Sequence, residues 1–284
     1  MRRRELLHLF RHGPFSAFEI VYRAAIVYAN LCQTPANHLT RSSAYDGLDP
    51  SEKSAISYFM GMTLAKLFAD KLLNVPLLMH LDVYRTELQP VHLSRSRPDL
   101  VGRNSAGHWI AIESKGRTNE YDAKALERAK EQVENLSGIQ GVVPTLRVAL
   151  LAYFDDGILE CVIDDPDERK TKEEVVDIPL TKEKLFEGYY RPFREWLREA
   201  PGAESEQIGN RRYRVGYLPE VDLSVGISDD LLAVENVKAA ERPRERSSTE
   251  HQYEGPDGLL IRVGELWSED NMQREPQERR IVVV

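Results

Sequence analysis

Three charged residues stand among apolar neighbours in the stretch RPDLVGRNSAGHWIAIESKGR, which runs from Arg97 to Arg117. They are Asp99, Glu113 and Lys115, and the residues around them include Val, Ile, Trp and Ala. Burying such charges is costly unless counter-charges or a metal ion offset them. Two carboxylates beside a lysine can bind a divalent cation, and that combination is suited to the hydrolysis of a phosphodiester bond.

The stretch predicts a β-hairpin whose turn contains the residues NSAG. Positions 99 and 113 are equally distant from Ala106, so a turn centred there sets Asp99 directly opposite Glu113, with Cβ atoms about 4.5–5.5 Å apart. The period of two places Lys115 on the same face as Glu113 and Ser114 on the other face. Two carboxylates this close repel each other, and a hard divalent cation between them reverses that interaction.

Magnesium is the cation that this pattern favours, because it takes a few carboxylate oxygens, keeps several waters and binds phosphate. We expect Mg²⁺ as the cofactor, with Mn²⁺ as a substitute. The adjacent Lys115 could orient the attacking water, accept its proton or stabilise charge on the phosphate, and the sequence leaves these three roles open.

The surrounding sequence predicts the elements that would position these residues. Their order is helix, three strands, helix and strand, which indicates an α/β fold with a mixed central sheet flanked by helices. The long helix is predicted to begin with Asp49 as N-cap and Pro50 in its first turn. The expected ranges are helix 50–73, strands 76–84, 91–102 and 107–117, helix 119–136 and strand 146–154.

Outside this core the patterns are weaker. We expect a helix over 15–32, a strand over 159–164, a helix over 181–200 that is interrupted before Pro192, and a strand over 258–267. The predicted parts are a helical N-terminal segment (1–47), a central domain (48–200) and a C-terminal extension (201–284). Residues 238–258 have few large apolar side chains and are predicted to form a linker.

The motif Pro98-Asp99, followed after thirteen residues by Glu113-Ser114-Lys115, resembles that of the PD-(D/E)XK nuclease superfamily. The resemblance covers residues 48–155 and implies a restriction-endonuclease-like core. It implies that Asp99 and Glu113 bind the metal, that the backbone carbonyl of Ser114 adds a ligand, and that Lys115 is the catalytic lysine. The substrate implied is nucleic acid, with DNA preferred over RNA.

Two further residues have alternative interpretations. Many members of the superfamily supply an extra acidic ligand from the helix before the strands, where Glu52 lies, but Asp49-x-x-Glu52 also has the spacing of a capping box. Gln132 lies where the family often has a polar residue that touches the site or the DNA. The usual Gln-x-x-x-Tyr form is incomplete here, because Leu136 occupies the tyrosine position.

Charge suggests where phosphates would bind. Residues 85–130 contain 9 basic and 6 acidic residues, a net charge of +3, whereas residues 155–199 contain 8 and 14, a net charge of −6. Arg117 and Lys124 are the favoured phosphate contacts, and we expect the acidic segment to lie away from the basic surface around Arg97, Arg117 and Lys124. The other candidates are Arg97, Arg103, Arg128 and Lys130.

Composition sets the remaining expectations. The chain has 284 residues, a net charge of −8 and two cysteines, Cys32 and Cys161, with no metal-binding spacing. No apolar run approaches the ~20 residues of a membrane span, so we expect a cytoplasmic protein without a membrane partner. A homodimer is compatible with the resemblance, and the C-terminal extension is a candidate for binding a partner protein. The rival hypothesis is a non-catalytic binding or assembly module that retains the fold.

Overall fold

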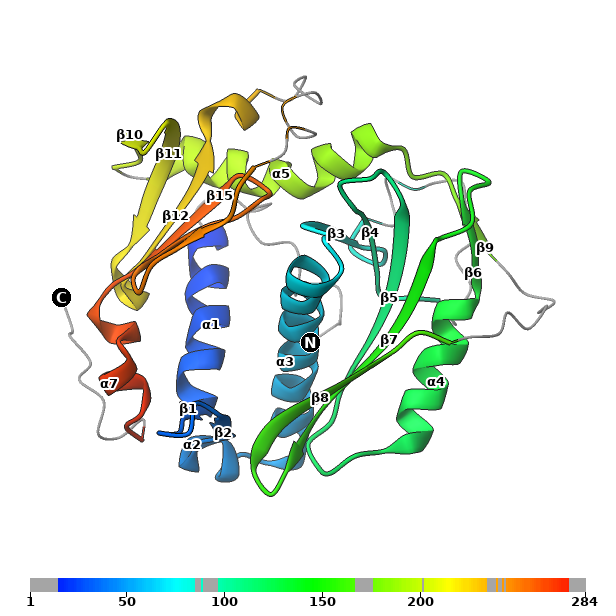
Figure 1. The fold of residues 1–284 in the computed structure, drawn as a ribbon. Helices are drawn as coiled ribbons and strands as arrows, with labels where there is room; N and C mark the ends of the chain where they lie inside the picture. The colour runs from blue at the N-terminus through cyan, green and yellow to red at the C-terminus, as the bar shows by residue number, and fades with distance from the viewer. Residues whose placement is uncertain are drawn as a thin grey trace. The chain divides into compact units, whose positions relative to one another are not determined.

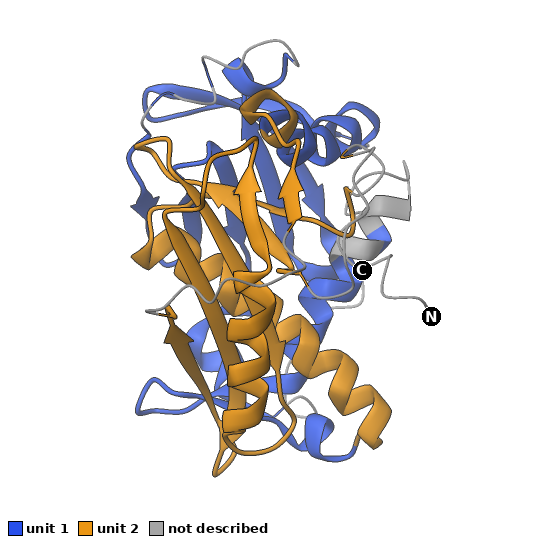
Figure 2. Ribbon diagram, turned by 90° about the vertical axis from the view of Figure 1, so that its right-hand side faces the viewer, with its two compact units in different colours: residues 1–47, 186–284 blue, residues 48–185 orange. Residues whose placement is uncertain are grey.

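The computed structural model describes residues 15–84, 88, 97–166, 176–200, 202–233, 239, 242 and 244–275. The chain forms two compact units (Figure 2). Unit 1 comprises residues 1–47 and 186–284, and unit 2 comprises residues 48–185. The whole stretch from Arg97 to Arg117 therefore belongs to unit 2.

Unit 2 begins with the long helix α3, Pro50–Leu72 (Figure 1). Asp49 is its N-cap and accepts hydrogen bonds from the backbone N–H groups of Ser51 and Glu52. Pro50 occupies the first turn, where a missing N–H costs nothing. The helix and its start are those that the sequence predicts.

The sheet of unit 2 follows α3. Within this unit the strand order is β8-β7-β5-β4-β3, with β5 and β7 parallel and the other neighbours antiparallel. Helix α4, Ala123–Glu134, connects the two parallel strands. This is the mixed α/β sheet expected from the order of the elements. The strands are β3 (Leu77–His80), β4 (Leu100–Arg103), β5 (Trp109–Gly116), β7 (Leu146–Asp155) and β8 (Ile158–Asp164).

One strand is shorter than predicted, and another is described only in part. The strand expected over 76–84 ends at His80, because residues 81–84 form a turn in which the N–H of Tyr84 donates to the carbonyl of His80. Of the strand expected over 91–102, only the end is seen, as β4; residues 91–96 lie outside the described residues.

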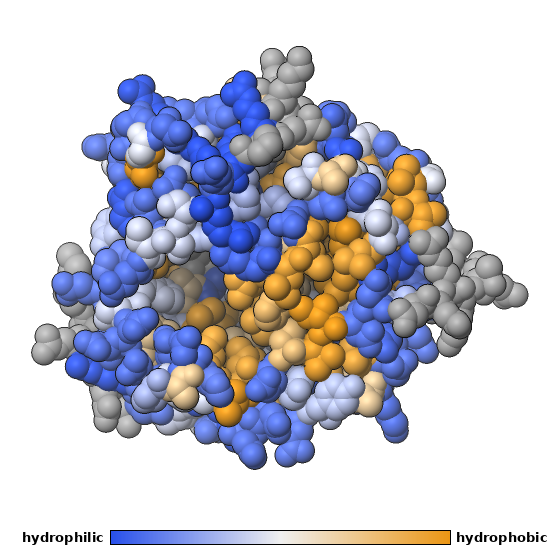
Figure 3. All heavy atoms as spheres, viewed as in Figure 1, coloured by the Kyte–Doolittle hydropathy of each residue, from blue (hydrophilic) through white to orange (hydrophobic). Residues whose placement is uncertain are grey.

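The two helices of unit 2 cover opposite faces of the sheet (Figure 1). On the α3 side, Gly116 comes so close to the backbone of Ser57 that an added Cβ would overlap the Ser57 carbonyl oxygen. On the α4 side, Ala125, Leu126 and Ala129 pack against β7. In the space-filling view, apolar side chains gather in the region of α3 and this sheet, with hydrophilic side chains around them (Figure 3).

A second, smaller pairing completes unit 2. Strand β6, Leu136–Ile139, follows α4 directly and pairs in parallel with β9, Val176–Ile178. The buried Arg147 of β7 donates from Nε and Nη2 to the carbonyl of Leu136, which ties this pair to the main sheet.

Unit 1 combines the two ends of the chain. Its main sheet is antiparallel, in the order β10-β11-β12-β15-β14-β13. Its elements are α1 (Phe15–Asn30), β1 (Leu31–Gln33), β2 (Leu39–Arg41), α2 (Ser43–Asp46), β10 (Glu204–Ile208), β11 (Arg211–Leu218), η1 (Pro219–Val221), β12 (Leu223–Ser228), η2 (Asp229–Leu231), β13 (Ser247–Ser248), β14 (Gln252–Glu254), β15 (Leu259–Val263), η3 (Glu265–Trp267) and α7 (Glu269–Met272). Helix α5, Lys182–Glu199, spans the boundary between the units.

Two expectations for this part of the chain differ from the structure. Helix α5 continues through Pro192. Proline inside a helix costs about 3 kcal/mol, and here the buried side chains of Tyr190, Trp196 and Leu197 on the same helix offset it by packing. Within the segment 238–258, expected to be a linker, β13 and β14 pair with each other, and β14 also pairs with β15.

Two further expectations concern the cysteines and membrane-spanning helices. Neither Cys32 nor Cys161 is part of a disulfide. Among the helices that the structure describes, none has the length and apolar character needed to cross a membrane.

Candidate active site

The hairpin of β4 and β5 positions the acidic residues. Leu100 pairs with Ile112 and Arg103 with Trp109, so paired residue numbers are symmetric about Ala106, as predicted. In the turn, Gly107 has φ +86°, a conformation that favours glycine. Continuing the register by one residue beyond β4 sets Asp99 opposite Glu113.

Hydrogen bonds connect Asp99 and Glu113 across the hairpin. The backbone N–H of Asp99 donates to Oε2 of Glu113 at 2.8 Å, and the N–H of Ser114 donates to Oδ2 of Asp99 at 3.3 Å. Each carboxylate therefore accepts a backbone hydrogen bond from the opposite strand. The two acidic side chains are brought together at one place, as the register predicts.

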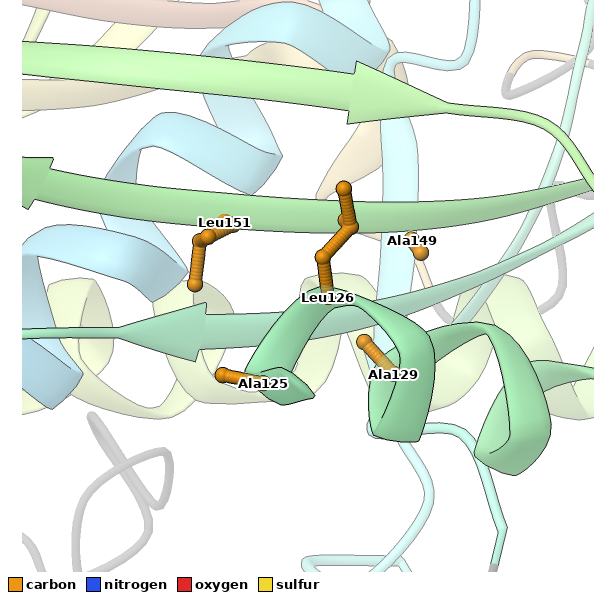
Figure 4. Close-up of a cluster of buried hydrophobic side chains, with 5 residues drawn as sticks. All are labelled: Ala125, Leu126, Ala129, Ala149 and Leu151. Atoms are coloured by element: carbon orange, nitrogen blue, oxygen red, sulfur yellow. The ribbon is translucent and has the colours of Figure 1, made fainter. Parts of the chain in front are cut away.

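Lys115 completes the group. Its Nζ contacts Oε1 of Glu113, in an ion pair whose glutamate side chain is 1% exposed and whose lysine side chain is 29% exposed. The side chains of Glu113 and Lys115 lie on the α4 face, because these residues pair with Ala149 and Leu151 of β7, which pack against that helix. Figure 4 shows this apolar packing between α4 and β7.

The environment changes the acidity of Glu113. Burial, and after it the negative charge of Asp99, raise the pKa of its carboxyl from 4.5 to about 8. The charge and hydrogen bond of Lys115 and the N–H of Asp99 oppose the rise. The negative charge of Glu113 is therefore costly at this position, and Lys115 offsets part of the cost.

Ser114 occupies the opposite face of β5. It is buried, and in the described part of the chain its Oγ has no hydrogen-bond partner. A Cβ added to Gly61 of α3 would lie 3.0 Å from this oxygen, which shows how closely the helix packs there. The resemblance assigns Ser114 a metal-binding carbonyl, whereas the contact observed for its backbone is the N–H donated to Asp99.

Arg97, one of the further candidates for a phosphate contact, makes an ion pair that the sequence analysis did not predict. Its guanidinium Nη2 contacts Oδ1 of Asp82, and its side chain is only 12% exposed. Burial lowers the pKa of Arg97, while the charges of Asp99 and Glu113 raise it, so the guanidinium is close enough to feel both carboxylates. The signal was the alternation Arg97-x-Asp99, which places both side chains on one side of an extended chain.

Glu52 has the role of a helix cap. Its Oε2 accepts the backbone N–H of Asp49 at 3.2 Å, and Asp49 accepts the N–H of Glu52 in return, so the two form a capping box. Of the two interpretations of Glu52, the structure contains the contacts of the capping box. Its side chain is exposed at the start of α3.

The residues proposed to contact phosphate are spread between the end of β5 and helix α4. Nη2 of Arg117 lies 2.9 Å from Oδ2 of Asp122, the N-cap of α4, and Arg128 lies 3.9 Å from the same oxygen. Lys124 is exposed in the first turn of α4. Gln132 is half-buried near the end of that helix, and its backbone carbonyl accepts the N–H of Asn135.

Part of the acidic segment lies beside Lys130, one of the further candidates for a phosphate contact. The N–H of Arg117 donates to the carbonyl of Ala152, three residues before Asp155. Lys130 of α4 lies 2.5 Å from Oδ2 of Asp164 on β8. The reason is topological, because β7 and β8 lie beside β5 in the same sheet.

The donor set fits a cation that needs few protein ligands. In the residues that the structure describes, no group of three or more His, Cys, Asp and Glu side chains is arranged to hold a metal ion. Magnesium binds through one or two carboxylates together with waters and substrate phosphate. The carboxylates of Asp99 and Glu113 are therefore sufficient for Mg²⁺ and are too few for a closed metal cage.

No protein-family model matches this chain, and neither a curated protein nor a solved structure does.

Proposed function

We propose that this chain is a Mg²⁺-dependent nuclease with a restriction-endonuclease-like core of the PD-(D/E)XK type, and that it hydrolyses phosphodiester bonds, preferentially in DNA. The observation that supports this most is the convergence of Asp99, Glu113 and Lys115 at facing positions of β4 and β5. Charged groups with strongly shifted pKa values gather most often at functional sites.

Asp99 and Glu113 would hold the cation between them, and their mutual repulsion would favour its binding. A divalent cation at that position supplies a lower pKa for water and stabilises negative charge on the phosphate. Manganese would substitute for magnesium, because it accepts the same oxygen ligands.

Lys115 would act on the substrate. Its Nζ is the more exposed member of the pair with Glu113, so it can reach a phosphate while Glu113 stays buried. A lysine there can stabilise charge on the phosphate oxygens or take up a proton from the attacking water.

Cleavage assays with a matched pair of variants test the proposal. Wild-type protein is incubated with plasmid, linear duplex, single-stranded DNA and RNA, each with Mg²⁺, Mn²⁺ or EDTA. We expect cleavage of at least one substrate with Mg²⁺ and none with EDTA. Lys115→Ala should lose cleavage, and Lys71→Ala, which removes an exposed lysine in the last turn of α3, should keep most of it. Equal cleavage by wild type and Lys115→Ala would show that the assignment is wrong.

A non-catalytic binding module is the second candidate. It is favoured by the small number of acidic ligands among the described residues and by the counter-charges that already accompany the carboxylates. Metal or nucleic-acid binding by wild-type protein, without cleavage of any of the four substrates, would place this candidate first.

A further inference from the structure

An exposed aromatic side chain lies in the loop between β5 and α4. Tyr121 is 49% exposed, and its ring meets the ring of Tyr153 edge-on, with the two centroids 5.6 Å apart and the planes at 68°. Tyr153 in turn packs against the apolar cluster between α4 and β7. Tyr121 is therefore held by an aromatic neighbour while about half of its surface stays exposed.

The sheet places this aromatic pair on the same face as Lys115. In the parallel register, Lys115 of β5 pairs with Leu151 of β7. Leu151 and Tyr153 are two residues apart on β7, so their side chains share a face, and both belong to the packing around α4. Tyr153 is thus displaced from Lys115 by one strand and by about 6–7 Å along the sheet, toward the end of β5.

The loop that carries this exposed tyrosine is fixed at both ends. The N–H of Arg117 donates to the carbonyl of Ala152 at 2.8 Å, and the N–H of Phe154 donates to the carbonyl of Asn119 at 3.4 Å, so the loop runs beside β7. At its other end, Asp122 is the N-cap of α4, and its Oδ2 lies 2.9 Å from Nη2 of Arg117. A ring on a loop held in this way loses little conformational freedom when a ligand stacks on it.

Charge indicates on which side of the aromatic pair a polyanion would lie. Residues 117–130, which form the loop and most of α4, contain 4 basic and 3 acidic residues, a net charge of +1. Residues 155–164, which form the turn after β7 and strand β8, contain 4 acidic and no basic residues, a net charge of −4. Tyr153 pairs with Glu160 on that side. A polyanion that reaches Lys115 is therefore favoured over the loop and α4 and disfavoured over β8.

An exposed aromatic ring beside basic side chains is a platform on which a nucleobase can stack, whatever the base. In an intact duplex the faces of each base are covered by the neighbouring bases, so stacking on a protein ring requires the base to leave the duplex, at a cost in free energy. An unpaired base presents its face without that cost. The surroundings of Tyr121 therefore suit a single strand better than a duplex.

We propose that Tyr121 stacks on an unpaired base next to the scissile phosphate, and that the substrate is single-stranded DNA. This inference rests on the nuclease function proposed above and deepens it by naming the substrate class. Lys115 contacts the phosphate, and the ring, further along the same face of the sheet, holds the adjacent base. Because stacking uses the face that all bases share, cleavage has little sequence preference.

Single-stranded DNA with one abasic nucleotide tests this inference. The strand is one that the wild type cleaves at a mapped position, and the abasic nucleotide is placed on either side of that position in turn. Affinity is measured by fluorescence anisotropy with Ca²⁺ in place of Mg²⁺, with recovery of intact DNA checked. For wild type, removal of the base on one side should weaken binding by about 5- to 100-fold, as expected for the loss of one stacked base. Tyr121→Ala should bind the intact strand more weakly by a similar factor, and removal of the base should then weaken it by less than about 2-fold more.

Two further variants separate stacking from packing. Tyr121→Phe keeps the ring and should bind within about 2-fold of wild type, whereas Tyr121→Leu keeps apolar bulk without a ring and should lose most of what Tyr121→Ala loses. Val142→Ala is the control, because Val142 is 55% exposed in the same unit but lies shortly before β7 begins, whereas Tyr153 lies near the end of that strand. It should bind every strand like wild type. Urea unfolding is compared for all variants.

Cleavage rates test the substrate class. Wild type should cleave the single strand faster than the same strand within a duplex, and Tyr121→Ala should lose most of this preference. Faster cleavage of the duplex, or of an RNA strand of the same sequence, would refute single-stranded DNA as the substrate.

The outcomes distinguish the two proposals. If wild type cleaves DNA but neither abasic position weakens its binding, or if Tyr121→Ala binds and cleaves like wild type, base stacking is refuted and the nuclease function stands. The same holds if Tyr121→Leu binds like wild type, or if only variants that unfold lose binding, since the tyrosine then serves packing. A wild type that neither binds nor cleaves nucleic acid overturns both proposals.

Discussion

Replacing Glu113 with Gln removes a buried charge while keeping the shape of the side chain. The pKa of Glu113 is about 8 in the folded protein, against an ordinary value of 4.5. Because the folded state holds this proton more tightly than the unfolded state, its contribution to stability is fully present below pH 4.5 and is lost as the pH rises through 8. The variant lacks this titration, so its stability should depend less on pH.

The size of the effect follows from the change in pKa. At 1.36 kcal/mol for each pKa unit, a change from 4.5 to about 8 corresponds to about 5 kcal/mol. Entry of water beside Lys115 reduces this, and we expect a measured change of about 2–5 kcal/mol between pH 4.5 and 9. Near pH 4.5 the variant should be about 1 kcal/mol less stable than wild type, because Gln offers one acceptor oxygen fewer. By pH 9 the order should reverse.

The assay has to report on unit 2, because the two units need not unfold together. Urea unfolding is followed at pH 4.5–9 in EDTA by pulsed hydrogen exchange of the peptide that covers residues 109–116. Glu120→Gln, at an exposed position of the same unit, is the control and should follow wild type at every pH. A difference in unfolding free energy between Glu113→Gln and wild type that stays constant over this range would refute the reasoning.

Three further predictions concern the packing of unit 2, the N-cap of α3 and the binding of metal. Gly116→Ala should destabilise unit 2 by about 2–3 kcal/mol in urea unfolding, because its Cβ would overlap the carbonyl of Ser57. Gly47→Ala in unit 1, whose Cβ would meet its nearest atoms at 3.6 Å, should be tolerated in urea unfolding that reports on unit 1. Asp49→Ala should lower the melting temperature by removing both N-cap hydrogen bonds, and Asp49→Asn, which keeps an acceptor oxygen, should restore most of it. Asp99→Asn should abolish the heat of Mg²⁺ binding in calorimetry, and unchanged binding would exclude Asp99 as a ligand.

The parts of unit 2 that the sequence predicted well are those where local signals agree. The N-cap Asp49 and Pro50 fixed the start of α3, and the turn around Ala106 fixed the register of the hairpin. The register sets Glu113 opposite Asp99, since a shift of one residue would have sent Glu113 to the α3 face. These features depend on residues close together in the chain, which is why one sequence sufficed.

The missed features depend on partners that are distant in the chain. The contact of Arg97 with Asp82 joins two segments across the start of β4, and no local pattern indicates it. The continuity of α5 through Pro192 depends on the packing of its apolar side chains, and proline alone predicts a break. Asp164 of β8 lies beside Lys130 of α4 because the arrangement of strands and helices in the fold, and not chain order, sets neighbours.

The burial of Glu113 is itself an argument for function. Its neighbours Ala111, Ile112 and Ala149 are almost fully buried, and an apolar side chain at position 113 would avoid the desolvation that raises its pKa. Replacing buried ion pairs by apolar residues is often neutral or stabilising, so stability alone does not explain a glutamate here.

The exposure of the charged groups also sets the direction from which a ligand must come. The exposed fraction of the side chain is 1% for Glu113 and rises to 12% for Arg97 and 29% for Lys115. Lys115 is the member nearest the end of β5, where the chain leads toward α4. Beside Arg97 the side chain of Asp82 is 46% exposed, so an anion approaching there meets a carboxylate, whereas at Lys115 the paired carboxylate of Glu113 is buried. A phosphate would therefore be attracted to the site chiefly by Lys115.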